Sequence, residues 1–453
     1  MKLELSRASA DIRFVGTFEG ELPSVPAIAN SSFKGEVGEW LPVFADRLCY
    51  IGMGPRDGIS ELRLRKIGGR VGMAFEKTKL ATGSLDLCGD FTDAQKSALA
   101  VSAALKAYRF DKYKSEKKPE QRLFVDMQKA AFGHALAVVD AVSMARDLTN
   151  EPSNRLSTTD FVGVVRGISG VEVEIFDAAA LERMGAGLIL AVGRGSESPP
   201  YMAVMKYMGR GGSDFDLGLV GKGVCFDSGG LCIKPSSGMW EMKGDMAGAA
   251  VVVSIMKLLA DTRAKKNVVA VAGLAENIPD GRAYRPGDIL RSLCGRTVEV
   301  VDTDAEGRLV LADCLSYVSG LKPRTVIDFA TLTGAMCVAL ADHMAGMFSN
   351  SDDLASAIER AGKLSGEEVW RLPLSKAYAD HLESKVADVA NLGHPDRVGG
   401  AVTAAEFLHG FVPDGISWAH IDIAGAATSD KGTDVSPKGT TGWGVELIER
   451  FLR

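Results

Sequence analysis

Carboxylate side chains gather in the stretch VDTDAEGRLVLAD, which spans residues 301–313. Asp302, Asp304 and Glu306 occupy alternate positions directly after an apolar run. If that run is a strand, alternate residues at its end point to the same side, so the three carboxylates would converge. The alternative is a solvated acidic turn that caps a helix starting near Gly307. This stretch alone does not decide between a site and a cap.

A second group of carboxylates favours a site. Asp227 follows a β-like run in GKGVCFDSGGLCIKP, residues 221–235, and Asp245 stands directly before a buried helix expected from Met246 to Leu259. Four carboxylates in one site would repel one another by about 3 kcal/mol per pair at roughly 5 Å, or about 20 kcal/mol in all. Two divalent cations would cancel these charges, and oxygen-rich sites suit such ions. The sequence therefore predicts a dinuclear metal centre at Asp227, Asp245, Asp304 and Glu306.

Hydrolysis is the reaction class that such a centre supports. Two neighbouring ions can bridge a water molecule, lower its pKa to give a hydroxide at neutral pH, and polarise a carbonyl oxygen. Lys234 and Arg308 are cations that can stabilise a developing oxyanion or hold an auxiliary anion. Their alternative role is ion pairing that balances the surplus carboxylate charge.

Three other motifs in the sequence favour no competing chemistry. The DSGG at residues 227–230 resembles a serine-protease nucleophile loop, but no histidine lies in a recognisable catalytic motif. GLVGKG at residues 218–223 lacks the spacing of a phosphate-binding loop and its Ser or Thr after the lysine. The sequence also contains no HExxH, HxxEH or CxxC motif of the common zinc sites.

The elements that must position these residues alternate between β-like and helical patterns, which indicates an α/β fold. We expect a smaller N-terminal α/β domain over residues 1–120, with strands at LELSRA, ADRLCYIGMG and RVGMAFE and a helix over Asp93–Lys106. A connecting helix is expected over 121–150, because apolar residues recur at helical spacing from Leu123 to Leu148. The catalytic domain is expected over 151–453, with a mainly parallel, mixed sheet covered by helices on both faces and its site at the carboxyl ends of strands.

Composition limits the other possibilities. The chain has 453 residues, of which 46% are hydrophobic, enough for two cores. It has no apolar run of 18 residues and no apolar stretch at its N-terminus, so we expect a cytoplasmic protein without a membrane partner. The formal net charge of −6 comes from well-mixed acids and bases. A nucleic-acid partner is therefore not expected, since acidic residues also dilute the basic loop at 108–122.

Four segments resemble the signature segments of the leucyl aminopeptidases, a family of dinuclear metallopeptidases. They are DTDAEGRL (302–309), VGKGVCFDSGGLCIKP (220–235), MKGDMAGAA (242–250) and AENIPDGRAYRPGD (275–288). WAHIDIAGAA and TTGWGVELI near the C-terminus are similar too, so the resemblance covers nearly all of the catalytic half. The N-terminal part is similar only loosely.

The resemblance implies a role for each candidate residue. Asp227 and Glu306 would bridge the two metals, Lys222 and Asp245 would complete the tighter site, and Asp304 would complete the more exchangeable one. A lysine ligand must be neutral, which costs about 4 to 5 kcal/mol at pH 7 and requires an adjacent dication. Lys234 would polarise the scissile carbonyl, and Arg308 would hold a bicarbonate that acts as general base on the water that becomes the metal-bridged hydroxide.

The resemblance also implies how a peptide would bind. The free α-amino group would bind a metal and Asp245, which makes the enzyme an exopeptidase. Residues Met242, Thr331 and Gly334 would line an apolar pocket for an N-terminal Leu or Met, and backbone groups of Ala305, Gly307 and Leu332 would assist substrate and anion binding. Asp302 stands where the family usually has Asn, so the added carboxylate would favour a basic residue after the scissile bond or tighten a metal. Gly244 replaces a residue that is usually bulkier, which changes the shape of the pocket.

The implied protein is a cytosolic metallo-aminopeptidase that removes apolar N-terminal residues from peptides. Two divalent ions per subunit are expected, Zn or Mn first and Co or Mg as alternatives, with bicarbonate as the auxiliary anion. The implied assembly is a homohexamer formed as a dimer of trimers. A DNA-binding or regulatory module is the second hypothesis, and it would require a basic groove.

Overall fold

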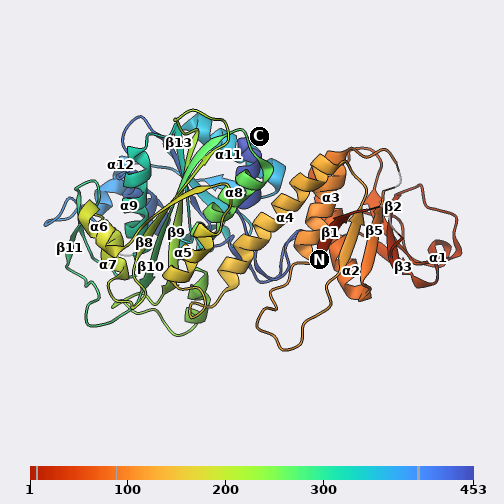
Figure 1. Cartoon of the computed structure of the whole chain (residues 1–453), viewed down its shortest axis with the longest axis horizontal. Helices are drawn as coiled ribbons and strands as arrows, with labels where there is room; N and C mark the ends of the chain where they lie inside the picture. Colours follow the sequence, from red (N-terminus) through yellow and green to blue (C-terminus); the bar gives the residue numbers. More distant parts are fainter. Residues whose placement is uncertain (7–8, 88, 395–397) are drawn as a thin grey trace. The chain divides into compact units, whose positions relative to one another are not determined.

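The computed structural model describes residues 1–6, 9–87, 89–394 and 398–453. The chain divides into two compact units (Figure 1). Unit 1 comprises Met1–Ser143 and Ser429–Thr441, and unit 2 comprises Met144–Thr428 and Gly442–Arg453. Each unit has a sheet with helices packed against it, so the predicted two-part α/β fold with a smaller N-terminal part is confirmed. No described helix is long and apolar enough to cross a membrane.

Unit 1 is built on a six-stranded sheet in which only the last pair is antiparallel. In spatial order its strands are β1 (Lys2–Leu5), β6 (Arg122–Val125), β5 (Thr82–Asp86), β2 (Ile12–Phe18), β4 (Leu48–Gly54) and β3 (Trp40–Val43). Its helices are α1 (Pro26–Ala29), α2 (Glu61–Thr78) and α3 (Asp93–Lys106), and α4 (Lys129–Asn150) crosses into unit 2. The helix predicted over Asp93–Lys106 is therefore confirmed, as are strands at β1 and β4, although residues 7 and 8 of the predicted first strand lie outside the described residues.

Two expectations for this part of the chain are wrong. The run RVGMAFE lies inside α2, whose buried residues Leu64, Ile67, Val71 and Phe75 recur at helical spacing. Its glycines serve helix packing, because a Cβ at Gly72 would lie 2.3 Å from the Ala103 carbonyl oxygen of α3. The connecting helix begins only at Lys129, since Arg122–Val125 pairs with β1 and β5 as a strand. Leu, Phe and Val fit a helix or a strand, so the local sequence does not distinguish the two. Pairing with β1 and β5, which are distant in sequence, makes this segment a strand.

Unit 2 contains an eight-stranded mixed sheet. In spatial order its strands are β15 (Val369–Arg371), β14 (Ala345–Ser349), β17 (Ser417–Asp422), β13 (Thr325–Ala330), β9 (Leu217–Asp227), β10 (Asn267–Asn277), β8 (Tyr201–Met208) and β7 (Glu172–Phe176). The central strands β17, β13, β9 and β10 are all parallel, whereas β14, β8 and β7 are antiparallel to their inner neighbours. The predicted mainly parallel, mixed sheet is confirmed.

Two helices, α8 (Ala247–Thr262) and α9 (Gly307–Gly320), cover opposite faces of this sheet. Along β9, a Cβ at Gly221 would lie 2.6 Å from Ala249 of α8, and one at Gly218 would lie 3.0 Å from Val318 of α9. Odd and even positions of β9 therefore face different helices. The predicted buried helix after Asp245 is confirmed, because α8 is buried along most of its length.

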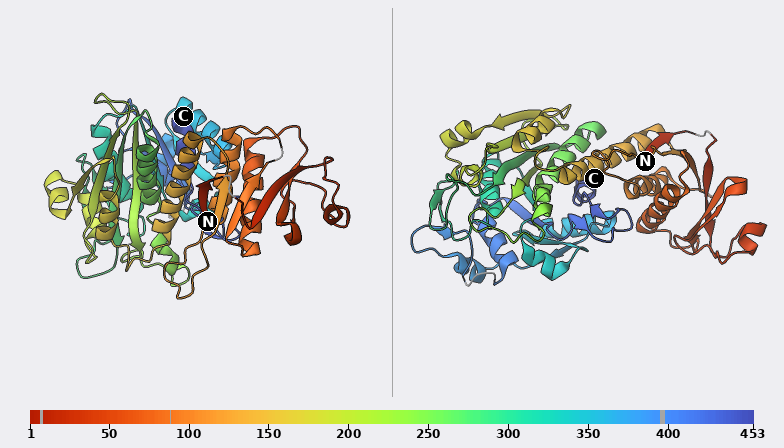
Figure 2. Two further views of the ribbon diagram at one scale, coloured as in Figure 1. Left: turned by 45° about the vertical axis from the view of Figure 1, so that its right-hand side comes forward. Right: turned by 90° about the horizontal axis from the view of Figure 1, so that it is seen from below.

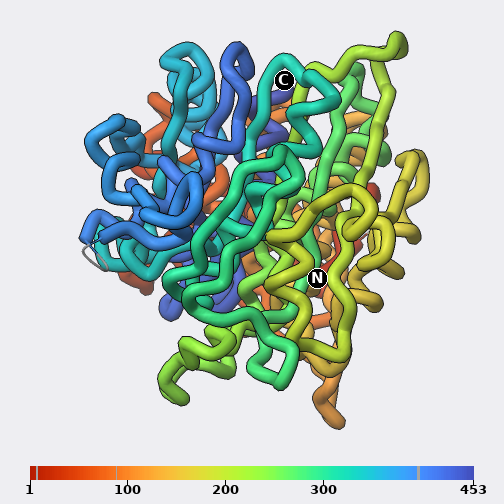
Figure 3. The backbone as a smooth tube through the Cα atoms, turned by 90° about the vertical axis from the view of Figure 1, so that its left-hand side faces the viewer, coloured from red at the N-terminus to blue at the C-terminus, as the bar shows by residue number. Residues whose placement is uncertain are grey.

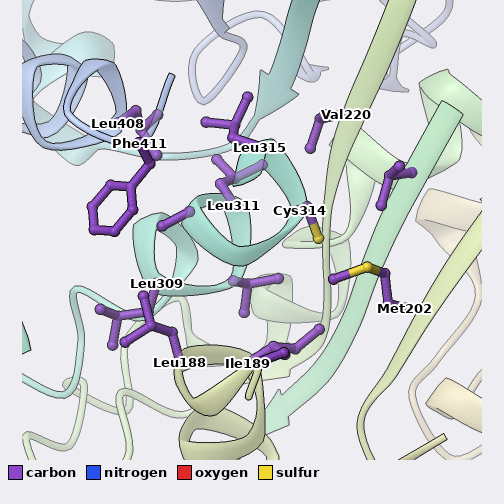
Figure 4. Packing of buried hydrophobic residues seen from close by; sticks show 14 of the residues in the cluster. Leu188, Ile189, Met202, Val220, Leu309, Leu311, Cys314, Leu315, Leu408 and Phe411 are labelled. Carbon is purple, nitrogen blue, oxygen red and sulfur yellow. The ribbon is translucent and has the colours of Figure 1, made fainter. Parts of the chain in front are cut away.

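A large hydrophobic cluster lies on the α9 side of the sheet. Figure 4 shows Leu311, Cys314 and Leu315 of α9 packed among side chains such as Val220 of β9 and Ile189 of α7 (Gly187–Gly193). Each of these side chains is excluded from solvent, and burying one Leu or Ile stabilises the fold by roughly 1.5 to 3 kcal/mol. The cluster fixes where the N-terminus of α9 meets the sheet.

The chain through the remaining elements of unit 2 can be followed from yellow to blue in Figures 2 and 3. The other helices are α5 (Thr158–Arg166), α6 (Ala178–Met184), α10 (Gly334–Leu340), α11 (Asp352–Ser365), α12 (Lys376–Ala379), α13 (Gly400–His409) and α14 (Val445–Leu452). Strands β11 (Ile289–Arg291), β12 (Thr297–Glu299) and β16 (Val389–Ala390) form a small sheet. The pair of β18 (Thr428–Ser429) and β19 (Gly439–Thr440) lies where the chain enters and leaves the second segment of unit 1, Ser429–Thr441.

Candidate metal centre

The candidate site lies where the four central parallel strands of unit 2 end. Asn277 at the end of β10 is paired with Asp227 at the end of β9, and Ala330 at the end of β13 is paired with Asp422 at the end of β17. Carboxyl ends of neighbouring parallel strands meet at one edge of a sheet, which is where ligand sites of open α/β sheets lie.

Three buried carboxylates converge at this edge. Asp227, Asp245 and Glu306 each offer an oxygen that lies within 4.8 Å of the others. Asp227 ends β9, Asp245 lies between the 3₁₀ turn Met239–Gly244 and α8, and Glu306 is the N-cap residue of α9. Three separate elements therefore deliver one carboxylate each to the same place.

Lys222 lies within this group and is almost fully buried. Its Nζ donates to Asp245 Oδ1 at 2.7 Å and to the Thr331 carbonyl oxygen at 3.0 Å, and it lies 2.9 Å from Glu306 Oε1. Burial opposes the ammonium form, but the surrounding carboxylates outweigh it and raise the pKa of Lys222 above its ordinary value. With the protein's own charges alone, Lys222 is thus a cation that balances the carboxylates.

Lys234 connects Asp304 to the cluster. Its Nζ lies 2.7 Å from Asp227 Oδ2 and also forms an ion pair with Asp304 Oδ1. Burial, strengthened by the charge of Asp227, raises the pKa of Asp304 to about 7. The four predicted carboxylates and both lysines therefore form one connected group. Asp304 is its most exposed carboxylate, with 34% of its side chain accessible.

Asp227 is held by groups that the sequence alone did not single out. Its Oδ1 accepts from the backbone N–H of Gly229 at 2.8 Å and from Asn277 Nδ2 at 2.9 Å. Asn277 Nδ2 and the Tyr284 hydroxyl both donate to the Thr303 carbonyl oxygen, at 2.9 and 2.7 Å. Asn277 and Tyr284 belong to the AENIPDGRAYRPGD segment, so their place in a signature segment was the available signal.

Asp302 does not join the carboxylate cluster. The chain from 301 to 306 is a turn and not a strand, so alternation does not bring the three acids to one side. Asp302 Oδ1 instead accepts from the backbone N–H of Asp304 at 2.8 Å, as a short turn-forming Asp does. The predicted convergence from a strand end is wrong for Asp302, while the turn still delivers Asp304 and Glu306 to the site.

Arg308 is a buried cation beside the cluster. Its Nη1 donates to the Asn391 carbonyl oxygen at 2.8 Å, and its Nε has no hydrogen-bond partner within the described ranges. Burial lowers the pKa of Arg308 to about 10, against the opposing effect of Glu306. A buried guanidinium with an unpartnered N–H is suited to an anion.

The residues predicted to bind a substrate lie on or beside the elements that form the carboxylate cluster. Thr331 and Leu332 follow β13, and Gly334 begins α10. Thr331 Oγ1 donates to Asp245 Oδ1 at 2.8 Å, so this loop contacts the carboxylate cluster directly. Met242 precedes Asp245 in the 3₁₀ turn, and Ala305 and Gly307 flank Glu306.

The donor set fits divalent cations. Carboxylate oxygens are hard ligands that suit such ions, and the cluster has more acids than bases. Asp245 Oδ2 is buried without a hydrogen-bond partner among the described residues, which is costly unless another group binds it. Lys222, Asp227, Asp245, Asp304 and Glu306 would hold the ions.

Gly307 gives a test of how tightly the site is packed. A Cβ at this position would lie 2.4 Å from Lys222 Cε and 2.7 Å from its Nζ. Lys222 is buried and held by three acceptors, so it cannot withdraw without losing them. We expect Gly307→Ala to cost about 1 to 3 kcal/mol of stability by overpacking and to lower kcat/KM for an aminoacyl amide by about 100-fold.

The matched control is Gly320→Ala at the other end of α9, where an added Cβ meets nothing within 4 Å. Kinetics and chemical denaturation of both variants measure the effects. Equal activities of the two variants would show that Lys222 has room to move.

The fold and site define a two-part α/β protein with a candidate metal centre of carboxylates and lysines at the ends of its parallel strands. The model of the cytosol aminopeptidase family catalytic domain matches residues 143–449, and that of the family's N-terminal domain matches residues 17–117. The chain belongs to the cytosol aminopeptidase family, as the signature segments predicted, and is a metal-dependent aminopeptidase.

Relatives match over most of their length. A probable cytosol aminopeptidase of Dinoroseobacter shibae is 46% identical over 401 residues, which cover 86% of this chain and 80% of the relative. One of Methylobacterium radiotolerans is 42% identical over 475 residues, which cover 99% and 93%.

Solved structures also match the whole chain. The bottromycin maturation enzyme BotP in complex with Mn has a TM-score of 0.90 and 35% identity, with coverage of 98% of this chain and 99% of that one. The cytosol aminopeptidase of Coxiella burnetii has a TM-score of 0.87 and 29% identity, with coverage of 99% and 98%.

Proposed function

We propose that this aminopeptidase hydrolyses the N-terminal peptide bond of peptides that begin with an apolar residue such as Leu or Met. The observation that carries the proposal is the buried cluster of Asp227, Asp245 and Glu306, joined by two lysines at the strand ends. The chemistry is assigned to the proposed catalytic domain over 151–453, with 1–120 and β6 in the N-terminal domain and α4 as the connection.

The proposed cofactor is a pair of divalent ions. Asp227 and Glu306 would bridge them, Lys222 and Asp245 would complete one site, and Asp304 the other. Mn is supported by the similar structure of BotP, which is a complex with Mn, and Zn, Co and Mg are the alternatives. When bound, the ions would supply Lewis-acid activation of a water molecule and of the scissile carbonyl.

The protein's own residues would then orient and neutralise the reacting groups. Asp245 Oδ2, which has no partner among the described residues, would accept a hydrogen bond from the substrate's free α-amino group. Lys234 is 20% exposed, so its ammonium can donate to the carbonyl oxygen as negative charge develops there. The unpartnered Nε of Arg308 would donate to a bicarbonate that accepts the proton from the attacking water.

Other residues would define specificity. Met242, Thr331 and Gly334 would line the pocket for the N-terminal side chain, and the backbones of Ala305, Gly307 and Leu332 would bind substrate and anion. Asp302 would favour a basic residue after the scissile bond. A cytoplasmic location and a hexamer formed by two trimers are part of the proposal, supported by family membership.

Metal removal and replacement test the proposal. Exhaustive chelation is expected to lower kcat/KM for leucine amide by at least about 10³-fold, because several kcal/mol of transition-state stabilisation are lost. Reconstitution with Mn, Zn, Co or Mg separately, against a panel of aminoacyl amides, then identifies the ion and the preferred side chain. N-acetyl-leucine amide is the control, since it lacks the free α-amino group that Asp245 would bind. Full activity after chelation, or cleavage of the acetylated amide, would contradict the proposal.

A further inference from the structure

Asp422 is a fully buried carboxylate at the end of β17 whose hydrogen bonds go to the neighbouring loop. Its Oδ1 accepts from the backbone N–H of Leu332 and of Ala424, both at 3.1 Å. Its Oδ2 accepts from the Thr333 hydroxyl at 2.7 Å. Two of its three hydrogen bonds therefore fix the loop between β13 and α10.

The same loop contacts the metal centre one residue earlier. The Thr331 carbonyl oxygen accepts from Lys222 Nζ at 3.0 Å, and the Thr331 hydroxyl donates to Asp245 Oδ1 at 2.8 Å. Both contacts require Thr331 to present its two oxygens in a fixed orientation. β13 restrains the chain before Thr331, whereas Asp422 restrains it directly afterwards.

We infer that Asp422 is a positioning residue for the aminopeptidase reaction, which acts by holding Leu332 and Thr333 so that Thr331 orients Lys222 and Asp245. The inference rests on the proposed function of Lys222 and Asp245. Groups outside the metal ligands that fix the orientation of those ligands through hydrogen bonds typically contribute 10- to 100-fold to metal affinity or activity. The inference assigns that contribution to a carboxylate on a strand that carries none of the proposed metal ligands.

Three variants test the inference. Asp422→Ala removes both oxygens, and we expect kcat for leucine amide to fall about 10- to 100-fold with little change in KM. Asp422→Asn keeps one oxygen for the Leu332 and Ala424 N–H groups, while its amide can donate to the Thr333 hydroxyl. We expect this variant to regain most of the lost kcat.

Asp313→Ala is the matched control. Asp313 is also fully buried and accepts three backbone N–H groups, from Leu188, Ile189 and Leu293, but it lies in α9 away from the cluster. We expect it to destabilise the fold while leaving kcat per folded molecule unchanged. Equal kcat losses in Asp313→Ala and Asp422→Ala, or wild-type kcat in folded Asp422→Ala, would overturn the inference.

A further variant and two measurements that do not depend on turnover keep the inference testable. If Asp422→Ala does not fold, Thr333→Val keeps the size of the side chain but removes its contacts to Asp422 and to the backbone N–H of Met336, and wild-type kcat in that variant overturns the inference. Hydrogen exchange of the 330–336 segment and titration with Mn²⁺ alone do not depend on turnover. We expect faster exchange and weaker Mn²⁺ binding in Asp422→Ala than in Asp422→Asn. Wild-type protein that stays inactive with each of Mn, Zn, Co and Mg would refute the proposed function, whereas equal exchange and Mn²⁺ binding in the two variants would refute the role of Asp422.

Discussion

Replacing Glu306 with Gln is expected to lower kcat/KM for leucine amide by at least about 10³-fold while the protein remains folded. Gln has nearly the same shape as Glu, so the change removes one charge from the cluster. Glu306 Oε1 lies 2.9 Å from Lys222 Nζ, and its side chain is buried with Asp227 and Asp245. A neutral amide is a poorer ligand for a divalent ion than a carboxylate, so the change would weaken binding at the proposed metal centre.

The measurement combines steady-state kinetics with metal content determined on the dialysed protein. Glu276→Gln is the matched control, because Glu276 is another buried glutamate near the end of β10 but accepts from Ser196 Oγ and lies outside the cluster. We expect the control to keep its metal and most of its activity. Wild-type metal content and kcat/KM in Glu306→Gln would exclude Glu306 as a bridging ligand.

The sequence predicted the catalytic half of the fold better than the N-terminal half, for a physical reason. The central strands of unit 2 are continuous apolar runs, such as NVVAVAGL in β10, which are typical of buried parallel strands. RVGMAFE in α2 is short and contains glycine, so its helical spacing appears only when the whole of α2 is considered. β6 has four residues, and its strand pairing depends on β1 and β5, which are distant in sequence.

The composition of the site was largely predictable, but its supporting contacts were not. Charge repulsion among four carboxylates indicates a cation site wherever the fold brings them together. The roles of Asn277, Tyr284 and Asp422 depend on which backbone groups they meet across neighbouring strands. These hydrogen bonds depend on strand register, which no local motif specifies. For Asp302, the predicted convergence with Asp304 and Glu306 was wrong because this stretch is a turn and not the end of a strand.

Lys222→Met is expected to destabilise chelated protein by about 3 to 5 kcal/mol, the usual cost of leaving buried charges without their partner. Met is similar in length and leaves Asp245 and Glu306 facing each other without a cation. Saturating Mn²⁺ is expected to recover part of this stability, because an ion that binds only the folded state stabilises it by mass action. Lys257→Met on the outer side of α8 is the control. Lys257 is 31% exposed, so we expect its loss to change stability by less than about 1 kcal/mol.

Proton release distinguishes the two candidate roles of Lys222, a neutral metal ligand and a charge-balancing cation. Its pKa is raised by the surrounding carboxylates, so it is charged at neutral pH, whereas a lysine ligand must be neutral. At a pH where the carboxylates of both proteins are ionised, binding of the first ion to wild-type protein should therefore release about one more proton than binding to Lys222→Met. Calorimetric titration with Mn²⁺ in buffers of different ionisation enthalpy measures this difference. Equal proton release with a destabilised fold would leave Lys222 as a charge-balancing cation, because deprotonation of the lysine is the step that a ligand role requires.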